Sequence, residues 1–167
     1  ACVAVAGCAA EAPPAVGARA AAGEAPAIGF DALLDFDRLA LLADWPAFQD
    51  SSYSREHQNA DSGNYIRVEE NGERVMVETD GPGVIYRIWS TGPAGGHLAP
   101  TTRVKFYFDG EATPRLDLAA CELFGDRGAA WPFVPPLSRT FESGAGAMEG
   151  PASLCYVPVP FAKSVKI

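Results

Sequence analysis

Residues 49–65 form the most polar stretch of the chain, and several of their side chains suit the binding of a polyhydroxylated ligand. Arg55, Asn59 and Asp61 stand close together there. An arginine fork, an amide and a carboxylate can each bridge neighbouring hydroxyl groups of a sugar. His57 has no regularly spaced partner that would complete a metal site, so we expect no metal here. The alternative is a solvated loop whose side chains bond to their own backbone.

A second group with binding chemistry lies in the stretch Thr-Asp-Gly-Pro-Gly-Val-Ile-Tyr-Arg-Ile-Trp-Ser-Thr, residues 79–91. Its glycines and proline predict a turn, and the β-branched and aromatic residues after them predict a strand. Arg87 and Trp89 are two residues apart, so they lie on one face of that strand. An indole beside a guanidinium suits a sugar, which has an apolar ring face and hydroxyl groups around it. In the alternative, Trp89 belongs to the core and Arg87 pairs with an acid.

Period-two alternation predicts the faces of this strand and the other strands of the domain. Val84, Tyr86 and Ile88 are expected in the core, and Ile85 is expected on the opposite face with Arg87 and Trp89. The other expected strands are residues 65–69, 74–78, 103–108, 114–118 and 154–161, with a hairpin turn at Asn71-Gly72 and another turn at Asp109-Gly110. A helical turn is expected within 118–123, and residues 125–153 are expected to be loop. Short strands without long helices predict an all-β jelly-roll sandwich.

The N-terminal segment resembles the end of a bacterial lipoprotein signal. Val5-Ala6-Gly7-Cys8 matches a lipobox, in which cleavage before the cysteine leaves Cys8 to carry the lipid. We therefore expect a signal remnant over residues 1–8 and a flexible Ala/Gly/Pro-rich linker over 9–28. Residues 29–42 have roughly helical apolar spacing and predict a short helical segment. The protein is then exported to the cell envelope and held at the membrane by its lipid anchor only.

Composition and charge exclude several classes of function. The formal net charge is −8 and no cluster of Lys or Arg occurs, so a nucleic-acid partner is not expected. Metalloprotease, α/β-hydrolase and phosphate-loop motifs are absent from the sequence, and no cofactor is expected. Besides Cys2 and Cys8, the chain has Cys121 and Cys155, and their pairing is left open.

The two ends of the chain predict a piece of a longer protein. The first residue is not Met, and the last four residues, Ser-Val-Lys-Ile, alternate like a strand that has just begun. We therefore expect residues 29–167 to be a truncated domain.

Taken in order, the motifs resemble the N-terminal part of glycoside hydrolase family 172, formerly domain of unknown function 2961. The resemblance runs from about Asp37 to the end of the chain. It rests on Ser51-Ser52-Tyr53 with Arg55, Asn59 and Asp61, on residues 80–91 and 106–111, and on Pro158-Val159-Pro160-Phe161-Ala162-Lys163-Ser164. The sequence departs from the family pattern at Ser54, where Asp is common, and at Glu56-His57-Gln58, where Gly is usual.

The resemblance implies the first half of a double jelly roll in a glycoside hydrolase that acts on furanosides, such as fructofuranosides or arabinofuranosides, and that assembles into homotrimers or multiples of them. It also implies two catalytic glutamates in motifs that follow the last residue of this chain. The chain alone is then expected to be inactive, with no catalytic residue identified in it. Arg55, Asn59, Asp61, Arg87 and Trp89 are the expected substrate-binding residues. The alternatives are a non-catalytic carbohydrate-binding domain and a structural β-sandwich.

Overall fold

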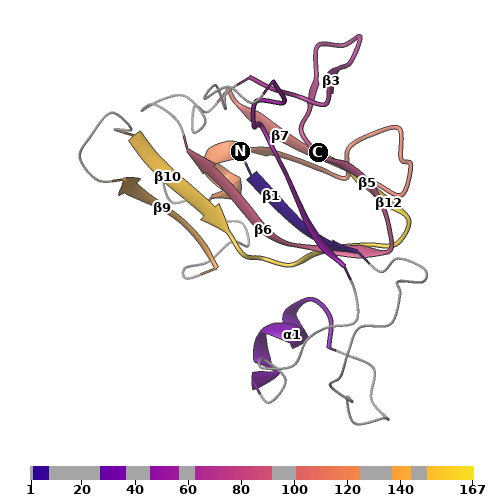
Figure 1. Cartoon of the computed structure of the whole chain (residues 1–167), viewed down its shortest axis with the longest axis vertical. Coiled ribbons are helices and arrows are strands. Elements are labelled where there is room, and N and C mark those ends of the chain that lie inside the picture. The colour runs from indigo at the N-terminus through magenta and orange to yellow at the C-terminus, as the bar shows by residue number, and fades with distance from the viewer. Residues whose placement is uncertain are drawn as a thin grey trace.

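The computed structural model describes residues 2–7, 27–36, 46–56, 63–91, 101–124, 137–143 and 150–167. They form two antiparallel sheets and a small hairpin with little helix, so the predicted all-β sandwich is confirmed. Figure 1 shows the long strand β6 (Gly83–Thr91) running through the middle of the fold.

The first sheet has the strand order β2-β1-β6-β10-β9, and β11 also pairs with β6. Its strands are β1 (Cys2–Gly7), β2 (Ala47–Ser51), β6, β9 (Ser138–Ser143), β10 (Gly150–Cys155) and β11 (Val159–Phe161). Figure 1 shows β1 beside β6, with β10 and β9 beyond it on the other side. The segment expected to be a signal remnant thus forms a strand inside this sheet. Its processing before Cys8, a residue outside the described part, stays a prediction.

The second sheet has the order β5-β12-β7-β8. Its strands are β5 (Glu78–Asp80), β7 (Arg103–Phe108), β8 (Leu116–Ala119) and β12 (Ser164–Lys166). The helical turn α2 (Ala120–Leu123) follows β8, as the sequence predicts. The hairpin β3 (Arg67–Val68) and β4 (Arg74–Val75) turns at Asn71-Gly72, where Gly72 has φ 83°, which confirms the predicted turn.

The core lies between the two sheets and is closed at one side by α2. Its buried side chains come from β6, β7, β10, β11, β12 and α2, and from Val77 between β4 and β5. Phe106 and Phe108 from β7 stack with ring centroids 6.3 Å apart, and Val104 packs against the same cluster. The predicted inward face of this strand is therefore confirmed.

A β-bulge at Tyr86 corrects the predicted faces of β6. On β1, Ala4 pairs with Arg87 and the next residue, Val5, pairs with Ile85, so Tyr86 is the extra residue. The bulge shifts the alternation by one, and Ile85 and Ile88 both enter the core although they are three residues apart. The prediction for Ile85 was wrong because strict period-two counting cannot register an inserted residue. Tyr86 is half-buried rather than core, and its hydroxyl accepts a hydrogen bond from the Gly29 backbone N–H at 3.4 Å.

Two predicted loops contain strands. β2 occupies the beginning of the polar stretch 49–65, and β9 with the start of β10 falls within 125–153. Apart from Phe48 in β2 and Phe141 in β9, the residues of the missed strands are polar or small. Pairing with a neighbouring strand supplies the order that their side chains do not indicate. The predicted strand 154–161 is split into the end of β10 and β11.

The first part of the expected helical segment 29–42 forms the short helix α1 (Phe30–Leu34), and residues 37–42 lie outside the described part. It lies at one end of the molecule, apart from the two sheets (Figure 1). None of its residues is buried, and Phe30, Leu34 and the following Phe36 are more than half exposed.

The predicted turn before β6 brings the Gly81 backbone close to the Phe161 ring. A Cβ placed on Gly81 would lie 2.7 Å from two ring carbons of Phe161, so a side chain there would displace a core residue. This contact ties the start of β6 to β11, which pairs with it through Gly83 and Phe161.

Candidate functional site

Arg87 and Trp89 lie on the outer face of the first sheet, opposite the core. Beyond the bulge, Ile88 and Ser90 are buried, Trp89 is half-buried, and Arg87 and Thr91 are exposed. The prediction that Arg87 and Trp89 share one face is therefore confirmed.

The strand register places further residues on the same face. Across the sheet, Ser51, Cys2 and Trp89 lie in one row, and Gln49, Ala4 and Arg87 lie in the next outward-facing row. Leu154 of β10 is the partner of Trp89 on the other side. We call this surface the Trp89 face; it comprises Gln49, Ser51, Arg87, Trp89, Thr91 and Leu154. Because adjacent strands lie about 4.8 Å apart, β2 is roughly 10 Å from β6 across β1, which is about the length of a disaccharide.

The guanidinium of Arg87 has no hydrogen bond or ion pair to another residue within the described part of the chain. It stands beside the half-buried indole of Trp89, so the two offer a flat apolar platform and a fork of free donors together. The alternative in which Trp89 is core and Arg87 pairs with an acid does not describe these residues.

Arg55 lies at the base of the loop that follows β2. Its guanidinium is 3.5 Å from the Asp50 carboxylate and 4.7 Å from the centroid of the Tyr53 ring. The Asp50 carboxylate also accepts the backbone N–H of Ser51 at 2.9 Å. Neither Asp50 nor Tyr53 belongs to the Trp89 face, so these contacts hold Arg55 to the loop and do not bring it to Arg87.

Three of the predicted site residues, Asn59, Asp61 and Cys8, lie outside the described residues. The described loop base ends at Glu56 and resumes at Gly63. Asn64 then donates a side-chain hydrogen bond to the Ser52 carbonyl at 3.0 Å, which brings the two ends of the loop together next to β2. The loop that carries Asn59 and Asp61 is therefore rooted beside the row that contains Ser51 and Trp89.

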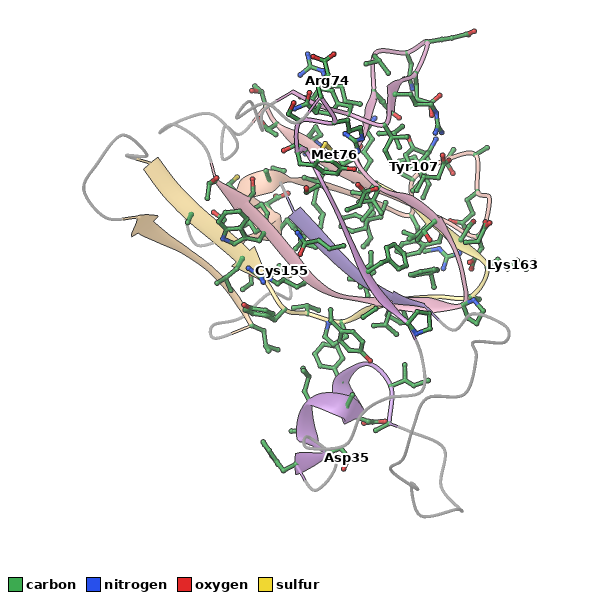
Figure 2. The ribbon with its side chains drawn as sticks, in the orientation of Figure 1. Asp35, Arg74, Met76, Tyr107, Cys155 and Lys163 are labelled. Carbon is green, nitrogen blue, oxygen red and sulfur yellow. The ribbon has the colours of Figure 1, made fainter. Side chains whose placement is uncertain are left out.

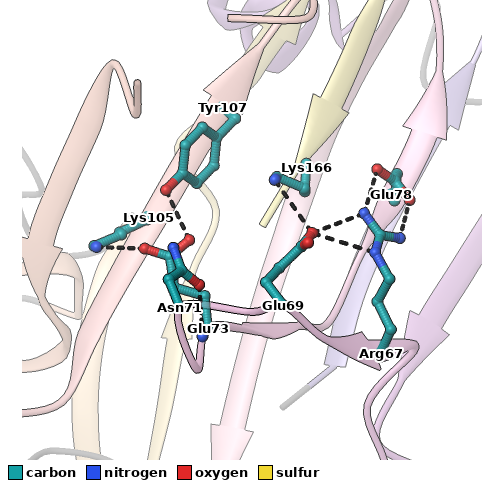
Figure 3. A network of polar contacts seen from close by, with 8 residues as sticks. All are labelled: Arg67, Glu69, Asn71, Glu73, Glu78, Lys105, Tyr107 and Lys166. Carbon is teal, nitrogen blue, oxygen red and sulfur yellow. Dashed lines mark hydrogen bonds and ion pairs between the residues drawn. The ribbon is translucent and has the colours of Figure 1, made fainter. Parts of the chain in front are cut away.

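A polar network on the outer face of the second sheet was not predicted from the sequence (Figure 3). Glu73, in the turn between β3 and β4, accepts bonds from Lys105 Nζ at 2.5 Å and from the Tyr107 hydroxyl at 2.8 Å. Lys166 of β12 lies over the Tyr107 ring, with Nζ 4.4 Å from its centroid, and 3.4 Å from Glu69. These contacts dock the β3–β4 hairpin onto β7 and β12.

A second branch of the same network runs through Arg67 of β3. Its guanidinium binds both Glu69 and Glu78, donating to Glu69 Oε1 at 2.9 Å and to Glu78 Oε1 at 2.9 Å. Figure 2 shows Tyr107 at the hairpin end of the molecule and Asp35, the residue after α1, at the opposite end, so the network and the helix are far apart. Charged residues at every second position of 67–69 and 103–105 could have suggested ion pairs. The sequence does not show which charges pair, because the partners lie on different strands.

A cavity of about 490 Å³ opens beside this network. Its lining comprises Glu78, Thr79, Asp80, Tyr107, Gly110, Glu111, Ser164, Val165 and Lys166. Of the predicted substrate-binding residues that the structure describes, Arg55, Arg87 and Trp89, none lines it. Glu78 is held by Arg67, and Glu111 is held by Arg115, so two of its three carboxylates are already neutralised.

The titration of the carboxyl groups bears on catalysis. Bonds from Lys105 and Tyr107 lower the pKa of Glu73, and the bond from Arg67 lowers the pKa of Glu78. Backbone N–H groups of Lys163, Ser164 and Ala162 lower the pKa of Asp109. Each of these three carboxyl groups has a lowered pKa and so favours its ionised form. The general acid of a glycosidase instead needs a raised pKa. Glu122 is used structurally, since it accepts the Ala119 backbone N–H at 2.8 Å.

The described residues contain no group of three or more His, Cys, Asp or Glu side chains arranged to hold a metal ion. In the same part of the chain, no helix is long and apolar enough to cross a membrane.

The family of the chain follows from comparison with known proteins. Residues 43–167 match the family described as GH172 first beta-sandwich domain. No curated protein and no solved structure matches the chain. The match spans β2 to β12 and agrees with the sandwich seen here. The chain therefore belongs to glycoside hydrolase family 172, of which it carries the first β-sandwich domain.

Proposed function

We propose that this domain belongs to an exported hydrolase of furanosides, such as fructofuranosides or arabinofuranosides, and that it binds the carbohydrate on the Trp89 face. The observation that supports this most directly is the exposed Arg87 beside Trp89, with no partner for its guanidinium in the described residues. A sugar ring would pack on the indole while the guanidinium donates to its hydroxyl groups. Family membership supports a carbohydrate as the ligand.

In this proposal the domain binds and other residues perform the chemistry. The pKa values of Glu73, Glu78 and Asp109 are lowered, which disfavours these three as a general acid. The catalytic glutamates would lie in a further part of the protein. Asn59 and Asp61 would complete the site from the loop rooted beside Ser51, and Arg55 would support that loop through Asp50.

Export, anchoring and assembly are parts of the same proposal. Cleavage before Cys8 and lipidation of its thiol would hold the protein at the cell envelope, and the domain would work in a homotrimer or a multiple of it. Mass spectrometry of protein from a bacterial host tests the anchor, and an unmodified Cys8 still joined to Gly7 would argue against it. Light scattering of the purified protein tests the assembly.

Calorimetry with fructofuranose and arabinofuranose oligosaccharides tests the binding role. Binding should be lost in Trp89→Ala and retained in Phe30→Ala, a matched loss of an exposed aromatic ring on α1. Equal affinities for the wild-type chain and Trp89→Ala would reject the Trp89 face as the sugar site. The second candidate is a non-catalytic carbohydrate-binding domain, which would bind a sugar on the same face without hydrolysing it. Measurement of hydrolysis by the full-length protein distinguishes the two.

A further inference from the structure

Strand β2 is attached to the sandwich through β1. On its inner side, β2 pairs with β1 from Ala47 opposite Ala6 to Ser51 opposite Cys2. β1 in turn pairs with β6 from Gly7 opposite Gly83 to Cys2 opposite Trp89. In the sheet order no other strand of the described chain lies next to β2. The position between β2 and β6 is therefore a complete strand site with a row of backbone partners on each side.

The residues that match the family domain do not include the strand that fills this site. The match to the first β-sandwich domain covers residues 43–167, which include β2 and β6 and leave out Cys2–Gly7. Without β1, the facing N–H and C=O groups of β2 and β6 would lose their hydrogen-bond partners. Leaving them unpaired costs free energy unless another strand or water takes the place of β1. The cleavage proposed above, before Cys8, would remove this same segment.

The site fixes the register of the strand that fills it and favours particular side chains in that strand. The bulge at Tyr86 keeps the inward and outward rows of β6 in step with those of β1 and β2. The occupant, Cys-Val-Ala-Val-Ala-Gly, is uncharged and alternates small residues with β-branched ones. An extended segment that adds to a sheet gains affinity from main-chain hydrogen bonds and specificity from its alternate side chains.

We propose that the position between β2 and β6 is a strand-acceptor site that binds an extended, uncharged peptide segment of small and β-branched residues, antiparallel to both strands. In the uncleaved chain the occupant is Cys2–Gly7. In a chain that lacks this segment, the site takes a segment of the same chemistry from another molecule. This inference does not depend on sugar binding, since it concerns strand pairing within the sheet.

Hydrogen exchange of the whole chain is the first test. The amides of Val3–Ala6 should be protected together with those of β2 and β6. Val5→Pro removes a donor and breaks the strand, whereas Val5→Thr keeps the β-branched shape and the N–H. The proline variant should lose protection in β1 and β2 and keep it in β7, and the threonine variant should match the wild type. Unprotected Val3–Ala6 amides in the wild-type chain would overturn the proposal.

The second test supplies the strand from outside. The probe is the peptide acetyl-Ser-Val-Ala-Val-Ala-Gly-amide, and its control has proline at both valine positions. The probe should slow exchange of the β2 amides about tenfold or more in Val5→Pro and in the chain that begins at Cys8, and it should leave the filled wild-type site unchanged. If the probe fails to restore β2 protection in both emptied chains, whether or not they keep β7 protected, the proposal is wrong.

Discussion

The Asp109 carboxylate accepts a hydrogen bond from the Lys163 backbone N–H at 2.6 Å, which joins the turn after β7 to the turn between β11 and β12. The same oxygen is 3.1 Å from the Ala162 nitrogen and 3.2 Å from the Ser164 nitrogen. Asp109 itself has φ 55°. One charged side chain thus satisfies three amides that lead into the last strand of the second sheet.

We expect Asp109→Ala to lower the melting temperature by several degrees, because it removes the acceptor and places a Cβ-bearing residue without a polar side chain at positive φ. Asp109→Asn is the matched control, since asparagine tolerates this backbone conformation and keeps one oxygen acceptor. It should lose less stability than the alanine variant. Thermal unfolding by circular dichroism measures both, and equal melting temperatures for all three proteins would contradict the assigned role.

The lowered pKa of Asp109 also predicts how stability depends on pH. A carboxyl group whose pKa is lower in the folded state than in the unfolded state binds more protons when unfolded, so its contribution is present above the unfolded value. That contribution is lost as pH falls from 3.8, the ordinary pKa of an aspartate side chain, through the lower pKa of the folded state. Glu73 and Glu78 act in the same direction from 4.5 downward. Urea unfolding between pH 2 and pH 7 should show stability falling on the acidic side, with a shallower fall in Asp109→Asn.

The bulge at Tyr86 predicts which residues of β6 stabilise the core. Ile85→Ala and Ile88→Ala should each lower the free energy of unfolding by about 2–5 kcal/mol, because both side chains are buried in the same cluster. Arg87→Ala should change it by less than about 0.5 kcal/mol, as expected for an exposed side chain. Urea denaturation checks all three. A small effect at Ile85, comparable with that at Arg87, would restore strict alternation and exclude the bulge.

The hairpin β3–β4 should be coupled to the second sheet through Glu73. A double-mutant cycle between Glu73→Ala and Tyr107→Phe is expected to give a coupling energy of about 0.5–1.5 kcal/mol, the usual range for one hydrogen bond. The side chain of Glu73 is one quarter exposed, which places the value toward the lower end of this range. The exposed pair Arg103 and Asp117 is the control, and its coupling should be smaller. Additive effects at Glu73 and Tyr107 would show that the hairpin is held by other contacts.

The sequence predicted the elements whose chemistry is local. β7 follows from its alternation, the β3–β4 turn from Asn71-Gly72, and the helical turns from short apolar spacing. The strands β1, β2 and β9 could not be predicted in the same way. Their order depends on partners that are distant in the chain, such as Val3 opposite both Asp50 and Ile88.

The candidate site likewise has one part that local sequence predicts and another part that it does not. The shared face of Arg87 and Trp89 follows from a separation of two residues on a strand, and the structure confirms it. The position of β2 beside this face requires knowledge of β1, which no local pattern supplies. Arg55 was expected to face the sugar with Arg87. It contacts Asp50 and Tyr53 within its own loop, and its role in sugar binding stays a prediction.

Arg87 provides the sharpest test of the binding role, because stability and affinity are expected to respond differently. Its guanidinium has no partner among the described residues, so Arg87→Ala should leave the melting temperature unchanged. A hydrogen bond from a charged group to a ligand is worth about 1.5–3 kcal/mol, so the same change should weaken binding of a furanoside oligosaccharide by roughly tenfold or more. Arg87→Lys keeps the charge and loses the planar fork, so its affinity should fall between those of the wild-type chain and Arg87→Ala. Calorimetry gives the affinities and circular dichroism gives the melting temperatures. A lower melting temperature with unchanged affinity would assign Arg87 a structural role, and the sugar site would then have to be sought away from the Trp89 face.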